Sequence, residues 1–234
     1  MFNLLVQLPI WQSNKIDWDT MTPALLQAIS ETLYMVSITL AIGGVCGLIL
    51  GCVLWCTRKG SLFSNPPIYR VLEFVVNLIR PVPFIIFLSA VQPATIAVVG
   101  TSLGTNAAIF PMAIFCTMAT SRIVEQSLIN VDYGVIEASF AVGASRIRTL
   151  FEVVIPEVLP PLILGYAFIF IGIMDMSAMA GTIGGGGLGD FAIQYGYNKF
   201  NPVITWISVV IILIIVQCVQ QLANFISRKL LSRN

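Results

Sequence analysis

The chain has 234 residues, of which 57% are hydrophobic and 10% are charged, and its formal net charge is +1. Soluble domains carry about 25% charged residues, so the composition indicates an integral membrane protein and gives no sign of a nucleic-acid partner. The chain contains no histidine, which excludes histidine acid–base catalysis and histidine metal sites. Its five cysteines lie in apolar stretches without a CxxC pair, as small buried hydrophobes do. We therefore expect no metal and no cofactor.

Charge-poor runs predict five transmembrane helices, because a helix needs about 20 apolar residues to cross a bilayer. The five ranges are 33–56, 70–92, 106–123, 158–180 and 200–227. The connections between them are short, and no internal repeat or low-complexity tract interrupts the chain. The predicted fold class is an all-α integral membrane protein with one transmembrane domain over 1–234 and a membrane core at 30–226.

Basic residues set the orientation of these helices. Nine of them fall on one side: Arg58, Lys59, Arg70, Arg122, Arg146, Arg148, Arg228, Lys229 and Arg233. The other side has only Lys15 and Lys199, and Arg80 falls inside the second helix. The N-terminus is therefore expected outside and the C-terminus in the cytoplasm. Residues 1–30 lack the basic start and cleavage site of a signal peptide, so an external or interfacial segment is expected before the first helix.

The first apolar run has a face of small residues. Gly43, Gly47 and Gly51 recur every four residues, which places three glycines on one side of the helix. Such a face lets another helix backbone approach closely. We expect tight helix packing there.

The second apolar run contains a predicted break. Pro81 and Pro83 remove backbone donors and interrupt a regular helix. In a membrane such a break is tolerated only against protein or a water-filled cavity. Arg80, Pro81 and Pro83 are therefore candidates for lining a pathway, with a simple structural kink as the alternative. Glu73 shares a helix face with Arg80 but lies about 10 Å away along the axis, so direct pairing would need both side chains to reach.

Asp175 is the one carboxylate placed deep in the fourth apolar run, where Ser177 and Met179 follow it. A carboxylate within a span costs about 2.5–3.5 kcal/mol on insertion scales, so it is retained where it faces a cavity or a partner. The functional interpretation is contact with the amino group of a solute, or gating of the path, with Ser177 and Met179 beside it. The alternatives are a structural pair with Arg80 and a protonated acid.

A glycine-rich stretch follows that helix. Gly184, Gly186 and Gly189 have the spacing of a dinucleotide-binding fingerprint. That fingerprint requires a preceding strand and a site facing cytoplasmic nucleotides, whereas this stretch follows a membrane helix on the external side. We predict instead a tight, mobile external loop that caps the path or touches a delivering protein.

A polar segment on the basic side separates two apolar spans. Its first part, Asp132–Val142, is predicted as a short helix that ends at Gly143. Ser145 can cap a second helix over Arg146–Val154, which Pro156 helps to end. Two short helices at an angle would form a knob on the inner face, suited to a cleft on a soluble partner. The alternative is an amphipathic segment lying on the lipid surface.

This segment resembles the EAA loop of permease subunits of ABC-type importers, which is written E-A-A-x3-G-x9-I-x-L-P. Four positions match at the family's spacing: Glu137, Ala138, Gly143 and Pro156. Three positions differ conservatively: Ser139, Val153 and Ile155. Further stretches are similar to the methionine-permease branch of the family: 77–86, 99–102, 177–179, 187–189 and 194–197. Asp175 departs from related permeases, which tend to be uncharged there, and this leaves the substrate open.

The resemblance implies a type I ABC importer permease fold in a bacterial inner membrane. Residues 130–157 would be the cytoplasmic coupling segment, docked on a separate ATPase through Glu137, Ala138, Ser139, Gly143, Arg146 and Pro156. Two copies of the chain would form the pathway, with two ATPase subunits beneath and an external substrate-binding lipoprotein delivering methionine. The chain has no Walker A sequence, so it would not itself be an enzyme. Alternatives are a permease for another small amino acid or related solute, and an ion-coupled secondary transporter.

Overall fold

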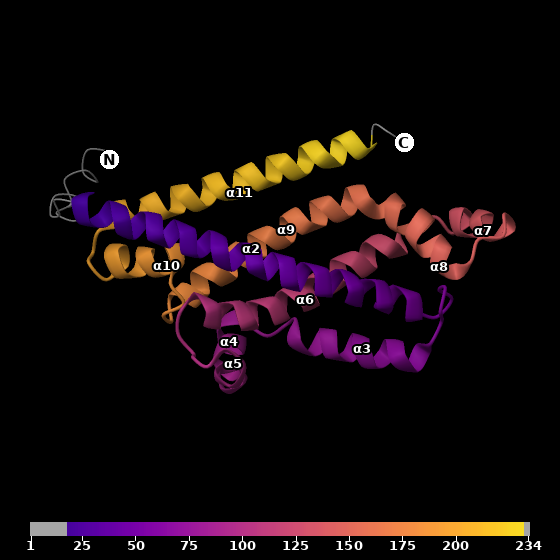
Figure 1. Cartoon of the computed structure of the whole chain (residues 1–234), viewed down its shortest axis with the longest axis horizontal. Coiled ribbons are helices and arrows are strands. Elements are labelled where there is room, and N and C mark those ends of the chain that lie inside the picture. Colours follow the sequence, from indigo (N-terminus) through magenta and orange to yellow (C-terminus); the bar gives the residue numbers. More distant parts are fainter. Residues whose placement is uncertain (1–17, 232–234) are drawn as a thin grey trace, which may run out of the picture. The chain divides into compact units, whose positions relative to one another are not determined.

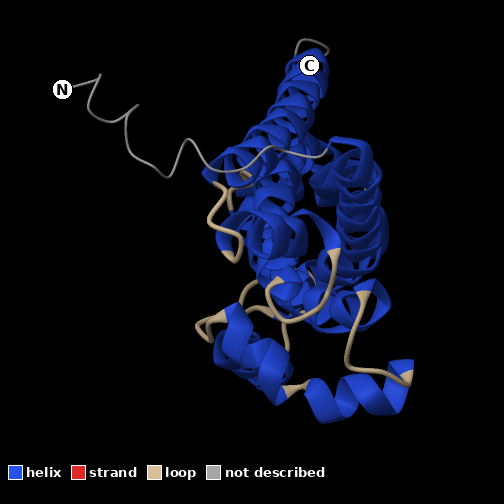
Figure 2. Cartoon of the chain, turned by 90° about the vertical axis from the view of Figure 1, so that its left-hand side faces the viewer, coloured by secondary structure: helices blue, strands red, loops and turns tan. Residues whose placement is uncertain are grey.

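The computed structural model describes residues 18–231, and every regular element within that range is helical (Figures 1 and 2). The first half of the chain contains α2 (Trp18–Thr57), α3 (Pro66–Ile79), α4 (Phe84–Ala90), α5 (Gln92–Val99) and α6 (Thr105–Ile129). The second half contains α7 (Tyr133–Ala141), α8 (Arg146–Thr149), the π-helical η2 (Leu150–Val154), α9 (Ile155–Gly181), α10 (Gly187–Phe191), the π-helical η3 (Ala192–Tyr197) and α11 (Pro202–Leu231). Lys15 and Arg233, which contribute to the predicted orientation, lie outside the described residues.

Four helical runs are long and apolar enough to cross a membrane: α2, α6, Arg146–Gly181 and α11. The broken pair α3 and α4 supplies a fifth candidate. The predicted interruption lies between them, since α3 ends at Ile79 and α4 begins at Phe84. The described chain is therefore all-helical with four to five candidate spans, and its orientation stays a prediction.

The helices extend beyond the charge-free runs in three places. α2 begins at Trp18 instead of near residue 33, and its added turns pack Ala28 against Leu188 and Phe191. α5 occupies the expected external connection 93–105. α10 and η3 occupy much of the expected connection 181–200. A search for runs of about 20 uncharged residues finds membrane-length helices, so it misses short helices and turns stabilised by tertiary contacts.

The described chain packs as two compact units. The first contains α2 up to Thr39 together with Phe84–Met112 and Gly172–Gln217. The second contains Leu40–Pro83, Ala113–Ile171 and the end of α11 from Cys218. The coupling segment lies in the second unit, and the glycine-rich stretch lies in the first.

Within the second unit, the glycine face of α2 packs directly on α6, as predicted. A Cβ atom added at Gly43 would lie 2.6 Å from Cys116 Cβ, and one added at Gly47 would lie 2.5 Å from Thr120 Cβ. Real Cβ atoms do not approach so closely, so only glycine permits this helix contact. Tyr166 of α9 adds a hydrogen bond of 2.8 Å from its hydroxyl to the carbonyl of Gly44.

Gly51→Ala is expected to destabilise the protein, because its new Cβ would lie 2.5 Å from Val124 Cβ and 2.6 Å from the Ser121 carbonyl oxygen. Overpacking of this kind costs about 1–3 kcal/mol, and thermal unfolding in detergent measures it. Gly172→Ala in α9 is the matched control, since nothing lies within 4 Å of its added Cβ. There, replacing glycine in a helix should stabilise by about 0.5–1 kcal/mol. Equal midpoints for both variants would contradict the close approach.

Candidate functional site

The coupling segment begins with a capped helix, α7. Asp132 is its N-cap, and the Asp132 carboxylate accepts a hydrogen bond of 2.8 Å from the amide of Gly134. The helix ends at Ala141 with Val142 as its C-cap, and Gly143 follows with φ +84°. The amide of Gly143 donates to the carbonyl of Phe140 at 2.9 Å. The predicted helix and its glycine break are both present, because a left-handed residue after a helix favours glycine.

The second helix begins where the sequence predicts, with Ser145 as its N-cap and the Ser145 hydroxyl accepting from the amide of Arg148. The prediction that Pro156 helps to end this helix is wrong. The helical run continues from Arg146 to Gly181, through the π-turn Leu150–Val154. In that turn the amide of Ile155 donates to the carbonyl of Leu150, five residues back. Proline lacks an amide donor and crowds the preceding turn of an α-helix, and a π-turn immediately before Pro156 changes the bonding pattern where the proline enters.

Ser139, where the EAA pattern has alanine, joins the two arms of the segment. Its hydroxyl donates to the carbonyl of Ile136 at 2.7 Å and lies 2.9 Å from the hydroxyl of Thr149. Since the Ser139 proton is used on the carbonyl, Thr149 is the donor in the second bond. Both residues are buried. The hydroxyl at position 139 thus fixes α7 against α8 inside the segment, and its side chain does not face outward.

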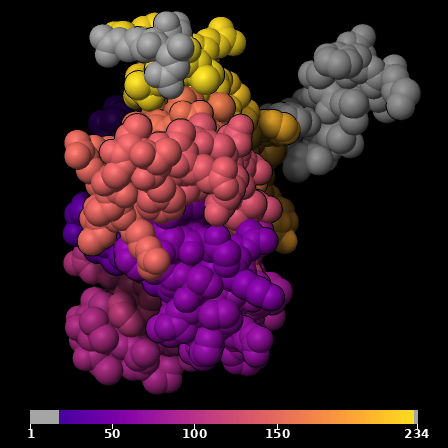
Figure 3. Space-filling model, turned by 90° about the vertical axis from the view of Figure 1, so that its right-hand side faces the viewer, coloured from indigo at the N-terminus to yellow at the C-terminus, as the bar shows by residue number. Residues whose placement is uncertain are grey.

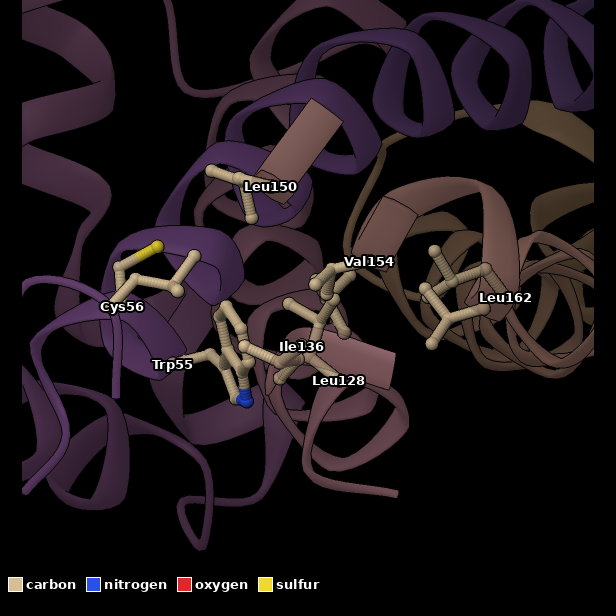
Figure 4. Packing of buried hydrophobic residues seen from close by; sticks show 10 residues of the cluster. Trp55, Cys56, Leu128, Ile136, Leu150, Val154 and Leu162 are labelled. Atoms are coloured by element: carbon tan, nitrogen blue, oxygen red, sulfur yellow. The ribbon is translucent and has the colours of Figure 1, made fainter. Parts of the chain in front are cut away.

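The underside of the segment is anchored in a hydrophobic cluster. Ile136, Leu150 and Val154 pack with Trp55 and Leu128, which lie near the ends of α2 and α6 (Figure 4). All five side chains are at most 8% exposed. Movement of the coupling segment would therefore be transmitted through packed side chains to α2 and α6.

The outer surface of the segment is exposed and partly apolar. In Figure 3 the residues of α7 and α8 form a broad raised surface beside those that follow α2. Val142 is 85% exposed, and Ile147 and Phe151 are each 62% exposed. The predicted contact residues Glu137, Ala138, Gly143, Arg146 and Pro156 are exposed as well. An exposed apolar surface with charged residues around it is typical of a protein–protein contact.

The pathway candidates near the break lie at the end of α3. Arg80 is the C-cap of α3 and is exposed, as are Pro81 and Pro83. Glu73 does not pair with Arg80. Its carboxylate lies 3.3 Å from the guanidinium of Arg122.

The candidates on α9 divide between two faces of the helix. Asp175 is exposed and forms no ion pair within its own unit among the described residues. Met179, four residues on, shares its face. Ser177 points away from both and is 1% exposed. The arrangement therefore keeps Asp175 with Met179 and separates Ser177 from them.

The glycine-rich stretch is hydrogen-bonded to α2, and part of it is helical where the sequence predicts a loop. The amide of Gly187 donates to the Glu31 carboxylate at 2.8 Å, and the amide of Leu188 donates to the Thr32 hydroxyl at 2.8 Å. Gly184 and Gly186 have φ values of +88° and +78°. Gly189 lies inside α10 and packs against the backbone of Ala178, where an added Cβ atom would find no room. These amides donate to side chains that are far away in the sequence. A local sequence pattern cannot predict such partners.

A polar cluster between α3 and α6, with the buried Glu125 at its centre, was not predicted from the sequence. Arg122 donates to the Glu125 carboxylate at 2.5 Å and to the Asn77 amide oxygen at 2.6 Å, besides its contact with Glu73. Tyr69 donates toward the same carboxylates, at 3.1 Å from Glu125 and 3.2 Å from Glu73. Glu125 is 2% exposed. Residues three or four apart are neighbours on a helix surface. The pairs Arg122 with Glu125 and Tyr69 with Glu73 were therefore the signal in the sequence for this cluster.

The bent coupling segment and the apolar helical spans are the features of this chain that indicate its class of protein. Comparison with known proteins gives the same class. The family described as "Binding-protein-dependent transport system inner membrane component" matches residues 43–232. The probable D-methionine transport system permease MetI of Vibrio cholerae is 39% identical over 205 residues, covering 88% of this chain and 91% of that protein. The methionine import system permease MetP of Bacillus subtilis is 41% identical over 203 residues, covering 87% and 91%.

Solved structures show the same relationship. A chain of the inward-facing MetNI methionine ABC transporter has a TM-score of 0.88 and 36% identity, covering 91% of this chain and 98% of that one. The fold is thus that of an ABC transporter permease, a membrane component that crosses the inner membrane several times. The chain belongs to the family of binding-protein-dependent transport system inner membrane components.

Proposed function

We propose that this chain is the permease subunit of an ABC importer for methionine. The observation that carries the proposal is the coupling segment, a hinged pair of helices with an exposed apolar surface, anchored beneath on α2 and α6. The methionine permeases MetI and MetP, each about two-fifths identical over most of the chain, support the substrate. The absence of a Walker A sequence means that a separate subunit supplies ATP hydrolysis.

In the proposed assembly, two copies of the chain form the pathway and two ATPase subunits bind beneath them. The N-terminus is outside and the C-terminus is in the cytoplasm, and an external binding protein delivers the solute. ATP binding draws the ATPase subunits together and carries the two coupling segments with them. The packed cluster around Trp55 passes that motion to the spanning helices, which alternate between two global states. Release of the hydrolysis products resets the inward-facing state.

Within the coupling segment, Glu137, Ala138, Gly143 and Pro156 contribute to the proposed ATPase contact. Ser139 acts from inside the segment, and Arg146 lies at the border of the contact, over the Phe63 ring. Arg80, Pro81, Pro83, Asp175, Ser177 and Met179 are the proposed pathway or gate residues. Gly184, Gly186 and Gly189 shape an external element that is proposed to meet the delivering protein. These assignments rest on the helix breaks, the exposed carboxylate and the ordered glycine turns described above.

Uptake of radiolabelled L-methionine into proteoliposomes tests the function directly. We expect uptake that requires the ATPase subunit, the binding protein and ATP. Competition by D-methionine and by other small amino acids would define the solute. Uptake driven by an ion gradient without the ATPase subunit would instead assign a secondary transporter.

Asp175→Asn is expected to change uptake more than assembly. The carboxylate is exposed inside an apolar helix, so its charge is available to a solute or to the gate, while no ion pair within its unit depends on it. Initial uptake rates measure the effect, and co-purification with the ATPase subunit measures assembly. Unchanged KM and maximal rate would mean that Asp175 has no part in transport.

A further inference from the structure

A cavity of about 330 Å³ lies in the second unit, between the end of α2, the end of α6 and the coupling segment. Three basic residues line it: Arg58, Lys59 and Arg146. Its lining contains no carboxylate. Three cations around one cavity with no acidic neighbour in the wall create a positive potential that favours an anion.

The charges of these three residues are not neutralised within the described chain. None of the ion pairs found among residues 18–231 involves these three side chains. Arg146 instead lies with its guanidinium carbon 5.9 Å from the centre of the Phe63 ring, a contact that holds the side chain and leaves its donors free for an anion. Arg148, two residues on, donates to Glu152 at 2.6 Å. The segment therefore has one arginine with a carboxylate partner and one turned to the cavity.

An orphaned hydroxyl also marks the cavity. Ser61 lies in its wall, in the turn that connects α2 to α3. The Ser61 oxygen is buried and has no hydrogen-bond partner. Buried polar atoms are nearly always satisfied, so an unpartnered one in a cavity wall points to a missing partner.

The rest of the wall is apolar and aromatic. Trp55, Leu62 and Leu128 line its inner part, and Tyr133 and Phe140 belong to α7. Tryptophan and tyrosine are enriched at the level of lipid headgroups. The cavity also lies where α2 and α6 end, on the side that the basic residues assign to the cytoplasm. Its occupant should therefore combine an anionic group with an apolar body.

We propose that this cavity binds the phosphate headgroup of an acidic phospholipid of the cytoplasmic leaflet. Arg58, Lys59 and Arg146 surround the phosphate, Ser61 donates to it, and the acyl chains leave along the apolar wall. Basic pockets between helices on the cytoplasmic side suit such headgroups. Because Arg146 belongs to the coupling segment and Arg58 follows a spanning helix, the bound lipid would join the moving segment to the end of α2.

The test compares two double variants of the full chain that each remove two positive charges. Arg58→Gln/Lys59→Gln removes cations from the cavity, and Arg70→Gln/Arg148→Gln removes them from exposed positions outside its wall. The protein is reconstituted in phosphatidylcholine nanodiscs that contain increasing amounts of phosphatidylglycerol. Lipid binding is followed by the environment of Trp55, or by native mass spectrometry of the retained phosphatidylglycerol. At about 1 kcal/mol per basic residue, the cavity variant should bind phosphatidylglycerol about 30-fold more weakly, while the control should change less than threefold.

Arg58→Lys/Lys59→Arg keeps both charges and should keep the affinity, which separates a lost site from a misfolded protein. Equal weakening in the cavity variant and the control would overturn the proposal, since only overall charge would then matter. So would inorganic phosphate that binds with the same dependence on Arg58 and Lys59 in detergent without lipid, because the ligand would be a free anion. The three basic residues could also be shielded from a chemical label only when the ATPase subunit is bound. That result would assign the cavity to the ATPase contact and would also overturn the proposal.

Discussion

Gly143→Pro should abolish ATP-driven uptake while the protein still inserts and assembles as a membrane protein. Gly143 has φ +84°, whereas proline is fixed near −65°. The substitution also removes the amide that donates to Phe140 at 2.9 Å. The turn between α7 and α8 would have to rearrange, at a local cost of about 3 kcal/mol or more. The exposed surface formed by Val142 and Ile147 would no longer keep its shape for a partner.

Gly143→Asn is the matched control, because asparagine tolerates the left-handed conformation better than other non-glycine residues. It should retain most of the uptake. ATP-driven uptake in proteoliposomes measures transport, and the ATPase rate of the complex with and without solute shows whether the two sites are still coupled. Wild-type uptake by the proline variant would remove the hinge from the proposed mechanism.

The second large effect is expected at Arg122, where Arg122→Met should lower the free energy of unfolding by about 3–5 kcal/mol. Glu125 is only 2% exposed, and the substitution leaves its buried carboxylate without the neighbouring cation. Glu73 and Asn77 would lose their partner on α6 too, so α3 would be held less tightly against α6. Thermal unfolding in detergent measures the loss.

Two comparisons isolate this contribution. Arg148→Met breaks an ion pair whose side chains are 66% and 60% exposed, and exposed pairs contribute about 0–1 kcal/mol. Arg122→Met/Glu125→Leu removes both buried charges and should recover much of the stability, because a buried pair replaced by apolar residues is often neutral. If Arg122→Met and Arg148→Met unfold at the same midpoint, the buried cluster does not stabilise the second unit.

The coupling segment could be predicted from sequence in considerable detail because its signals are local. Ser145 as a helix cap and Gly143 as the break are each fixed by a few neighbouring residues. Asp132, predicted as the first residue of the helix, is its N-cap. A cap or a left-handed glycine depends on the backbone immediately around it, so residue type suffices. Pro156 shows the limit of such reasoning, since the π-turn before it alters the bonding pattern in which proline ends a helix.

Contacts between distant residues escaped the same reasoning. Glu73 shares a helix face with Arg80 in the sequence, but in the structure it lies against Arg122 of α6. The glycine-rich stretch has the local pattern of a loop, but its Gly187 amide donates to Glu31 of α2. Neither partner can be chosen without knowing which helix faces overlap.

The sequence by itself determined that this protein is helical, lies in a membrane and has a polar two-helix segment between two spans, because apolar length, glycine spacing and caps act over a few residues. Tertiary structure alone decided that Ser139 faces inward to Thr149, that Arg122 joins α3 to α6 and that three cations meet at one cavity. Those arrangements depend on how separate helices pack. The free energy of packing comes from contacts between residues that are far apart along the chain.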